Sequence, residues 1–171
     1  MTGDTQIYTL LKDRIGSVVA LALVFTFCIA DMSFADDAAG PPIHFYADLS
    51  ADEQSAVTDS PALGRADFIL ERATLRFSWV ITYSDLTSAP TAAGLHGPQT
   101  PGGNAGLLVD IAKSGLGSPI KGSAIISDGE IDYLLTGKMY VNLRTVKYDL
   151  GELRGQIMRK RPSEVEQEEE Q

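Results

Sequence analysis

Hydrophobic and polar residues alternate almost without interruption between positions 75 and 83. One side of the pattern carries Leu75, Phe77, Trp79, Ile81 and Tyr83, and the other carries Arg76, Ser78 and Thr82, with Val80 as the exception. A period of two is that of a β-strand with one face in a core and the other in water. The aromatic residues of this stretch are therefore expected in the core rather than in an exposed binding stripe.

Strand-like patterns recur along most of the remaining chain. Shorter stretches that fit strands lie at residues 43–50, 66–70, 92–96, 122–126, 139–143 and 153–157. An almost entirely apolar run at 107–111 suits a strand covered on both faces, and the segment 71–74 offers the turn of a hairpin. Seven or eight short strands with turn signals at near-regular spacing predict an all-β fold, either a sandwich or a barrel.

One short helix is predicted between residues 127 and 137. Ser127 can cap its N-terminus, and Glu130 three residues later completes a capping box. The apolar residues at positions 131, 134 and 135 would share one face, and Gly137 is a natural C-terminal stop. A helix of about two turns needs tertiary packing to be stable.

The first 35 residues are predicted to be a secretory signal peptide. Lys12 and Arg14 precede an apolar run at residues 15–30, and Ser33 and Ala35 fit a cleavage site after Ala35. An uncleaved membrane anchor formed by residues 15–30 is the alternative, although this run is shorter than the about 18–20 residues that span a bilayer comfortably. Residues 36–42 have the composition of a linker. The single cysteine, Cys28, lies inside the apolar run, so the exported part would contain no disulfide.

The charge of the chain limits its partners. The formal net charge is −9, which argues against nucleic acids and anionic membranes as main partners. We expect the protein to contact a membrane only if its signal peptide stays uncleaved. Five glutamates fall within the last eight residues, and residues 162–171 are therefore predicted to be an acidic disordered tail outside the fold.

Three stretches of the chain share their order and spacing with a known family. They are Thr91-Ala92-Ala93-Gly94-Leu95-His96-Gly97-Pro98, Gly137-Lys138-Met139-Tyr140-Val141-Asn142-Leu143-Arg144-Thr145 and Gly151-Glu152-Leu153-Arg154-Gly155-Gln156-Ile157. Together they resemble the CHRD domain, a family named after chordin and found in many exported bacterial proteins. The resemblance covers roughly residues 43–159, and we expect the domain to occupy residues 43–161. It implies an extracytoplasmic, antiparallel, immunoglobulin-like β-sandwich with the short helix before the penultimate strand.

The chain departs from the family pattern at several positions. Where the family usually has His-x-His-Gly-Pro, this chain keeps only His96, and Gly94 stands at the first position. Arg144 stands where the family usually has a histidine after Tyr-Val-Asn. Glu53 is followed by Gln54 where the family often has Glu-Val-Pro-Pro. Histidines near one end of the sandwich could form a metal site in typical members, and their loss counts against such a site here.

A polar cluster is predicted around five residues of the three motifs, namely His96, Asn142, Arg144, Glu152 and Arg154. Glu152 and Arg154 share a strand face because they are two residues apart, and Asn142 and Arg144 are expected on a neighbouring strand. The cluster could be a ligand pocket, or a structural network of ion pairs and hydrogen bonds that joins the strands.

His96 is also a weak candidate for a metal ligand. Glu152, Asp110 or Asp85 could supply carboxylate partners, since a metal site needs three or four ligands held together. The alternative is that His96 only orders the Gly-Pro turn that follows it. The other histidine, His44, falls on the solvent side of its predicted strand.

These features favour a binding protein over an enzyme. Two histidines and no nucleophile motif predict no catalytic activity, and no cofactor is indicated. In chordin, CHRD domains belong to a secreted antagonist that binds growth-factor ligands. We therefore expect a secreted or periplasmic module that binds a protein or surface polymer through loops 51–63 and 97–106. The alternatives are a small metal-binding extracytoplasmic protein that uses His96, and a structural component of the envelope.

Overall fold

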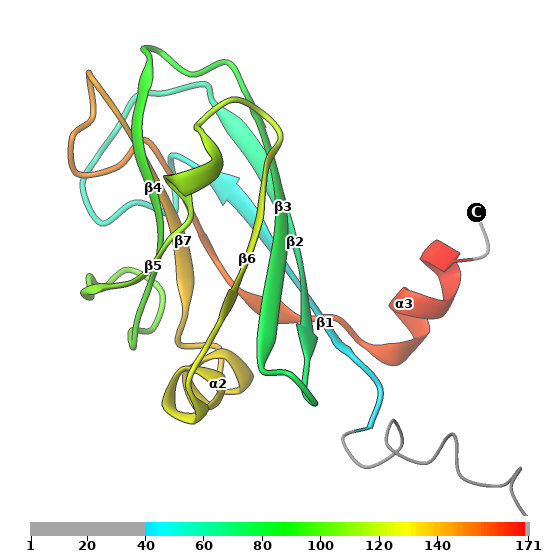
Figure 1. The fold of residues 1–171 in the computed structure, drawn as a ribbon. Coiled ribbons are helices and arrows are strands. Elements are labelled where there is room, and N and C mark those ends of the chain that lie inside the picture. The colour runs from blue at the N-terminus through cyan, green and yellow to red at the C-terminus, as the bar shows by residue number, and fades with distance from the viewer. Residues whose placement is uncertain (1–39, 170–171) are drawn as a thin grey trace, which may run out of the picture. The chain divides into compact units, whose positions relative to one another are not determined.

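Nine antiparallel strands form the framework of residues 40–169, the part of the chain that this computed structural model describes (Figure 1). The strands are β1 (Ile43–Ser50), β2 (Leu63–Glu71), β3 (Arg76–Ser84), β4 (Pro90–His96), β5 (Leu107–Asp110), β6 (Ile120–Ile125), β7 (Tyr140–Thr145), β8 (Leu153–Gln156) and β9 (Met158–Arg159). The helices are the 3₁₀ turn η1 (Ala112–Ser114), α2 (Asp128–Leu135) and α3 (Pro162–Glu169). The predicted signal peptide, the 15–30 anchor and most of the 36–42 linker lie outside the described residues.

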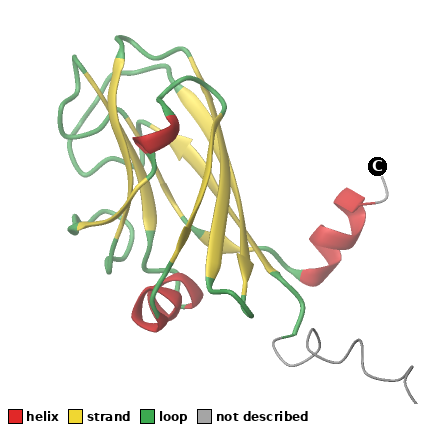
Figure 2. Ribbon diagram, in the orientation of Figure 1, coloured by secondary structure: helices red, strands yellow, loops and turns green. Residues whose placement is uncertain are grey.

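The strands follow one another along a single hydrogen-bonded path in the order β5-β4-β7-β8-β1-β2-β3-β6, and β9 pairs with β1. Every pairing along this path is antiparallel. The sheet curls around the core so that it is nearly closed and barrel-like, with β5 and β6 as its two ends (Figure 2). The predicted all-β antiparallel fold is confirmed, whereas the immunoglobulin-like arrangement stays a prediction.

The core is formed by the inward residues of the alternating strands. Phe68 and Phe77 stack with ring centroids 5.1 Å apart, and Phe45 meets Phe77 edge-on at 6.2 Å. Trp79 and Phe77 are buried as expected, and Val80 on the opposite face is 42% exposed. The strand starts one residue later than predicted. Leu75, which was expected to face the core, instead belongs to the turn and has a φ of 54°.

The predicted helix is present as α2, which begins after Ser127. The Ser127 hydroxyl accepts a hydrogen bond from the Glu130 backbone, and the Glu130 carboxylate accepts one from the Ser127 backbone at 2.7 Å. Gly137 ends the segment with a φ of 66°, a conformation that glycine adopts without strain. Leu134 anchors the helix in the core. Because β9 follows the last predicted strand, which corresponds to β8, α2 precedes the third strand from the end rather than the penultimate one.

Two other predictions need correction. The run at 107–111 was expected to be covered on both faces, but β5 ends the sheet, pairs only with β4, and leaves Leu107 57% exposed. The tail after residue 161 was expected to be disordered, but residues 162–169 form α3. Pro162 suits the first position of a helix, and the Glu164 carboxylate accepts a hydrogen bond from the Arg161 backbone at 2.8 Å.

Within residues 40–169, none of the helices combines the length and the apolar character needed to cross a bilayer.

Candidate functional site

The three family-like motifs form three neighbouring strands, β4, β7 and β8. The register pairs Gly94 with Asn142 and Asn142 with Arg154, so these positions form one row across the sheet. Tyr140 lies opposite His96, and Arg144 lies opposite Ala92. Valine and leucine residues between them face the core, which places His96, Asn142, Arg144 and Arg154 together on the outer face. Four of the five predicted site residues are thus brought together.

This outer face is covered, which is unusual for the polar side of an antiparallel strand. His96, Asn142 and Arg154 are only 6%, 7% and 1% exposed. The two loops predicted to carry binding lie over them: the Gln54 side chain donates to Asn142 Oδ1 at 3.0 Å, and Arg154 donates to Asn104 Oδ1 at 3.3 Å.

The two covering loops are also joined to each other. The Asn104 side-chain amide donates to Ser55 Oγ at 2.8 Å, and these residues are 49 positions apart in the sequence. Loops 51–62 and 97–106 therefore behave as a single cover over the outer face of β7 and β8.

An aromatic stack runs across the three strands beneath this cover. The rings of His96 and Tyr140 lie 5.3 Å apart and are inclined by 16°, and the Arg154 guanidinium carbon lies 3.6 Å from the centre of the Tyr140 ring. Because β7 lies between β4 and β8, Tyr140 is held between the imidazole and the guanidinium. A close cation–π contact of this kind stabilises a desolvated guanidinium by about 2 kcal/mol.

The imidazole of His96 is oriented by the loop that follows it. Nδ1 lies 3.2 Å from the carbonyl oxygen of Ala105, which can only accept, so we assign the proton to Nδ1 and leave Nε2 as the acceptor. Burial lowers the pKa of His96, the hydrogen bond to Ala105 opposes this, and the positive charges of Arg144 and Arg154 lower the pKa further. His96 is therefore neutral at pH 7.

Arg154 is a fully buried cation without a carboxylate partner. Its Nε and one terminal nitrogen have no hydrogen-bond partner, and no ion pair involves it within residues 40–169. Burial lowers the pKa of Arg154, and nearby Tyr140 and Glu53 partly offset that effect. Arg154 forms no ion pair with Glu152, although the two residues are two positions apart.

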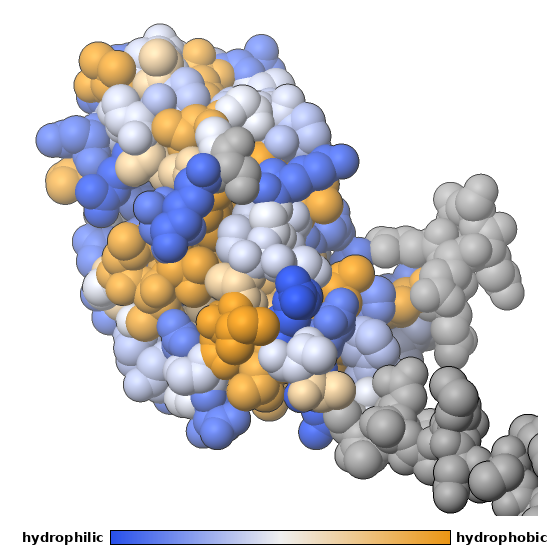
Figure 3. All heavy atoms as spheres, viewed as in Figure 1, coloured by the Kyte–Doolittle hydropathy of each residue, from blue (hydrophilic) through white to orange (hydrophobic). Residues whose placement is uncertain are grey.

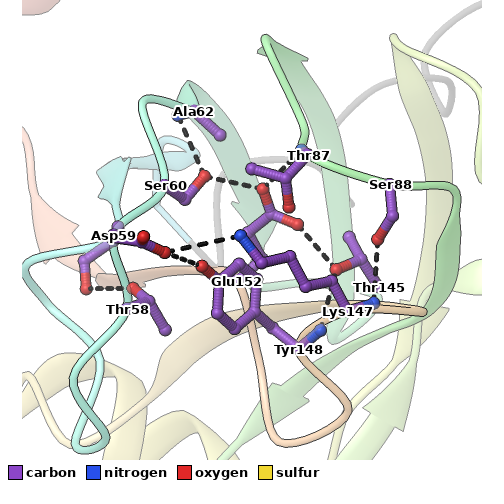
Figure 4. Close-up of polar contacts among 11 residues, drawn as sticks. Thr58, Asp59, Ser60, Ala62, Thr87, Ser88, Thr145, Lys147, Tyr148 and Glu152 are labelled. Atoms are coloured by element: carbon purple, nitrogen blue, oxygen red, sulfur yellow. Dashed lines mark hydrogen bonds and ion pairs between the residues drawn. The ribbon is translucent and has the colours of Figure 1, made fainter.

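Glu152 instead belongs to a separate hydrogen-bond cluster (Figure 4). Its carboxylate accepts from Ser60 Oγ at 2.6 Å, from Thr145 Oγ1 at 2.6 Å and from the Thr87 backbone at 2.7 Å. Burial alone would raise the pKa of Glu152, but these hydrogen bonds outweigh it and the pKa is lowered. The structural interpretation of the sequence pattern therefore holds for Glu152, which ties two loops to β7.

A pocket of about 370 Å³ opens beside the stack, at the edge of the cover. Its lining is Thr91, Ala92, Ala93, Gly94, His96, Leu107, Asp110, Ala112, Asn142 and Arg144. The Nε2 atom of His96 borders this space, because it lies 3.1 Å from the point where a Cβ on Gly94 would stand. Figure 3 shows hydrophobic residues gathered over β5, where the exposed Leu107 forms one rim.

The predicted metal ligands do not come together. Asp110 lines the same pocket as His96, but Glu152 lies in its own cluster and Asp85 follows β3. Among the residues that the structure describes, no group of three histidine, cysteine, aspartate or glutamate residues is placed to hold a metal ion.

Sequence reasoning missed several residues of the site. Tyr140 shares the two-residue period of Asn142 and Arg144, so its place on this face could have been read from the alternation. Gln54 and Asn104 lie in loops, and no local pattern indicates which strand a loop will cover.

The fold and the site define a small antiparallel β-domain with a covered polar face and a pocket at its edge. The profile of the CHRD domain family matches residues 45–157, well over half of the chain. This chain belongs to the CHRD domain family. No curated protein and no solved structure matches it.

Proposed function

We propose that this protein is an exported, non-enzymatic binding module that recognises a protein or an envelope polymer through the pocket and its two covering loops. One observation carries the proposal: the polar face of β4, β7 and β8 is enclosed by loops 51–62 and 97–106, yet remains open at the pocket beside His96 and Arg144. Rigid β-domains commonly carry recognition on loops that their strands position.

The lining of the pocket supports binding rather than catalysis. His96 Nδ1 is engaged by a backbone carbonyl, and within the described part of the chain its ring makes no hydrogen bond to a hydroxyl or thiol. Nucleophilic catalysis needs a hydroxyl or thiol within hydrogen-bond reach of such a base. Pockets that bind small groups combine apolar walls with a few convergent polar side chains, which describes this one.

The sequence before the domain supports export. The apolar run at 15–30 and the small residues before position 36 are typical of a removable signal. Fractionation of the producing cells and N-terminal sequencing of the recovered protein test this part of the proposal. We expect a mature N-terminus at Asp36 outside the cytoplasm, and a full-length protein in the cytoplasm would contradict export.

Site-specific photo-crosslinking in the producing cells tests the binding role. A photoreactive residue at Leu107, on the pocket rim, should give a discrete crosslinked product. The same residue at Val80, which is exposed on the outer face of β3, is the matched control and should give none. Equal products at both positions, or none at Leu107, would overturn the assignment of the binding face.

A further inference from the structure

We propose that the pocket beside His96 binds a carboxylate group, with Arg144 as its principal ligand. The inference rests on the proposed binding function and specifies the chemistry of what is bound. It is argued from the charge, the hydrogen-bonding atoms and the shape of the pocket, in that order.

Arg144 is the one arginine or lysine in the lining of this pocket, in a chain that is acidic as a whole. Arg144 lines the pocket, is only half-buried, and makes no hydrogen bond or ion pair to any of residues 40–169. Arg154, which packs on the Tyr140 ring, has two guanidinium nitrogens without a hydrogen-bond partner and forms no ion pair within residues 40–169. Asp110 is the one carboxylate in the lining, and its Oδ1 is occupied by the Ala112 backbone at 3.0 Å.

A guanidinium that is free to use two parallel N–H groups matches the two oxygens of a carboxylate. Asn142 does not compete for the Arg144 guanidinium, because the Asn142 side chain already accepts from Gln54 and donates to the Leu150 carbonyl. Arg144 is therefore the cation of the pocket that an anion can reach.

The shape of the pocket favours an organic anion over a bare inorganic one. The absence of a side chain at Gly94 lets the Leu107 methyl group and His96 Nε2 pack against its backbone, since a Cβ there would approach them to 2.3 Å and 3.1 Å. Ala92, Ala93 and Ala112 supply further aliphatic lining to the pocket. A carboxylate attached to a short aliphatic chain satisfies both sides of this lining.

His96 makes the binding depend on pH. With Nδ1–H held by Ala105, a second proton enters at Nε2, which borders the pocket and would then donate to the bound carboxylate. The groups that face His96 are Tyr140 and Arg144 on β7, Arg154 on β8 and Asp110 on β5, and the arginines disfavour the imidazolium in the empty pocket. A bound anion offsets that repulsion, so the affinity should rise as the pH falls through the pKa of His96, and by linkage the ligand must raise that pKa.

Nuclear magnetic resonance of the histidine rings tests the proposal on the mature protein. Sodium acetate is titrated against sodium chloride at constant ionic strength, and the ring signals of the two histidines are followed between about pH 5.5 and 8, where acetate stays ionised. His44, which is half-buried on β1 away from the pocket, is the internal control. We expect acetate to shift the His96 signals saturably and to raise the pKa of His96, with His44 unchanged.

Three variants sharpen the test. Arg144→Gln should weaken acetate binding at least about tenfold, because it removes the charged guanidinium and its two parallel N–H donors. Asp110→Asn should tighten it by about threefold, because it removes a like charge. Arg72→Gln, an exposed arginine in the β2–β3 turn, changes the net charge equally and should have no effect. A loss of affinity that is the same in Arg144→Gln and Arg72→Gln, or equal shifts of His44 and His96, would overturn the proposal.

The source of the carboxylate is distinguished by two blocked tripeptides, one with a central glutamate and one with a central glutamine. Tighter binding of the glutamate peptide than of acetate identifies an acidic side chain of a protein partner, and the reverse order identifies a free small acid. The outcome separates the two proposals. Crosslinks at Leu107 without any acetate-dependent shift of the His96 signals would overturn only the proposal that the pocket binds a carboxylate. An acetate-dependent shift without crosslinks would overturn only the macromolecular partner.

Discussion

Glu152 has no exposed surface and forms no ion pair within residues 40–169, and its charge is satisfied by hydrogen-bond donors. Ser60 and Thr87 come from two different loops, and Thr145 comes from β7. Hydrogen bonds to a charged group contribute more than neutral ones, about 1.5–3 kcal/mol each. The carboxylate therefore links the strands to the loops at this end of the domain through hydrogen bonds.

Replacing Glu152 by glutamine should destabilise the domain by about 2–4 kcal/mol, because the uncharged amide accepts more weakly and its nitrogen cannot accept the hydrogen bonds of the oxygen that it replaces. Urea unfolding at pH 7 measures the loss. Asp59→Asn is a control in the same region, since that carboxylate is exposed, and it should cost much less. Equal losses of unfolding free energy in the two variants would show that the hydrogen bonds to Glu152 stabilise the domain no more than an exposed carboxylate does.

The same carboxylate predicts how stability responds to acid. Because the pKa of Glu152 is lower in the folded protein than its ordinary value of about 4.3, its contribution is fully present above that value and is lost as the pH falls through the folded pKa. The difference in unfolding free energy between the wild type and Glu152→Gln should thus shrink below about pH 4. A constant difference from pH 7 to pH 3 would contradict the assignment.

At the scale of single elements, α2 is a helix of eight residues that depends on its ends. Ser127→Ala removes the hydroxyl half of its capping box and should cost about 1 kcal/mol of stability. Thermal unfolding measures it against Ser123→Ala, an exposed serine of β6 outside any helix. No difference between the two serine variants would mean that packing of Leu134 alone maintains the helix.

The contact between β8 and β1 is closer than any side chain allows. A Cβ at Gly155 would stand 2.3 Å from the backbone oxygen of Asp48, which cannot move aside, so Gly155→Ala should cost at least about 2 kcal/mol. At Gly94 the atom met at 2.3 Å is instead a methyl group of the exposed Leu107, which can rotate. We expect Gly94→Ala to lower the unfolding free energy by less than about 1 kcal/mol in the same experiment. The reverse order would contradict this reasoning.

At the scale of the whole molecule, one sheet path with two ends organises the domain. β5 and β6 occupy the ends and pair on one side only, whereas β1, β2, β3 and β7 lie inside the path. Local opening is easiest where strands have the fewest pairings and buried contacts. Amide hydrogen exchange should therefore be fastest in β5 and β6 and slowest in β1 to β3 and β7. Equal protection in β5 and β7 would argue against this order of strands.

The sequence by itself determined the features that depend on neighbouring residues. The two-residue alternation gave β3 and its buried aromatic residues, because a strand turns its side chains to opposite faces at every step. The capping box gave α2, because its donors and acceptors lie three residues apart. The order and spacing of the three motifs gave the family, and four of the five predicted site residues lie on one face as expected.

Only the tertiary structure decided what covers that face. Alternation shows that Arg154 and Asn142 leave the core, but it does not show that Asn104 and Gln54, 50 and 88 positions away, lie over them. Nor could it separate Glu152 from Arg154, because the carboxylate turns to donors from two distant loops, at Ser60 and Thr87, as well as to Thr145. Local patterns specify the side to which a residue points, whereas its surroundings depend on contacts between segments far apart in the chain, and those contacts created the pocket.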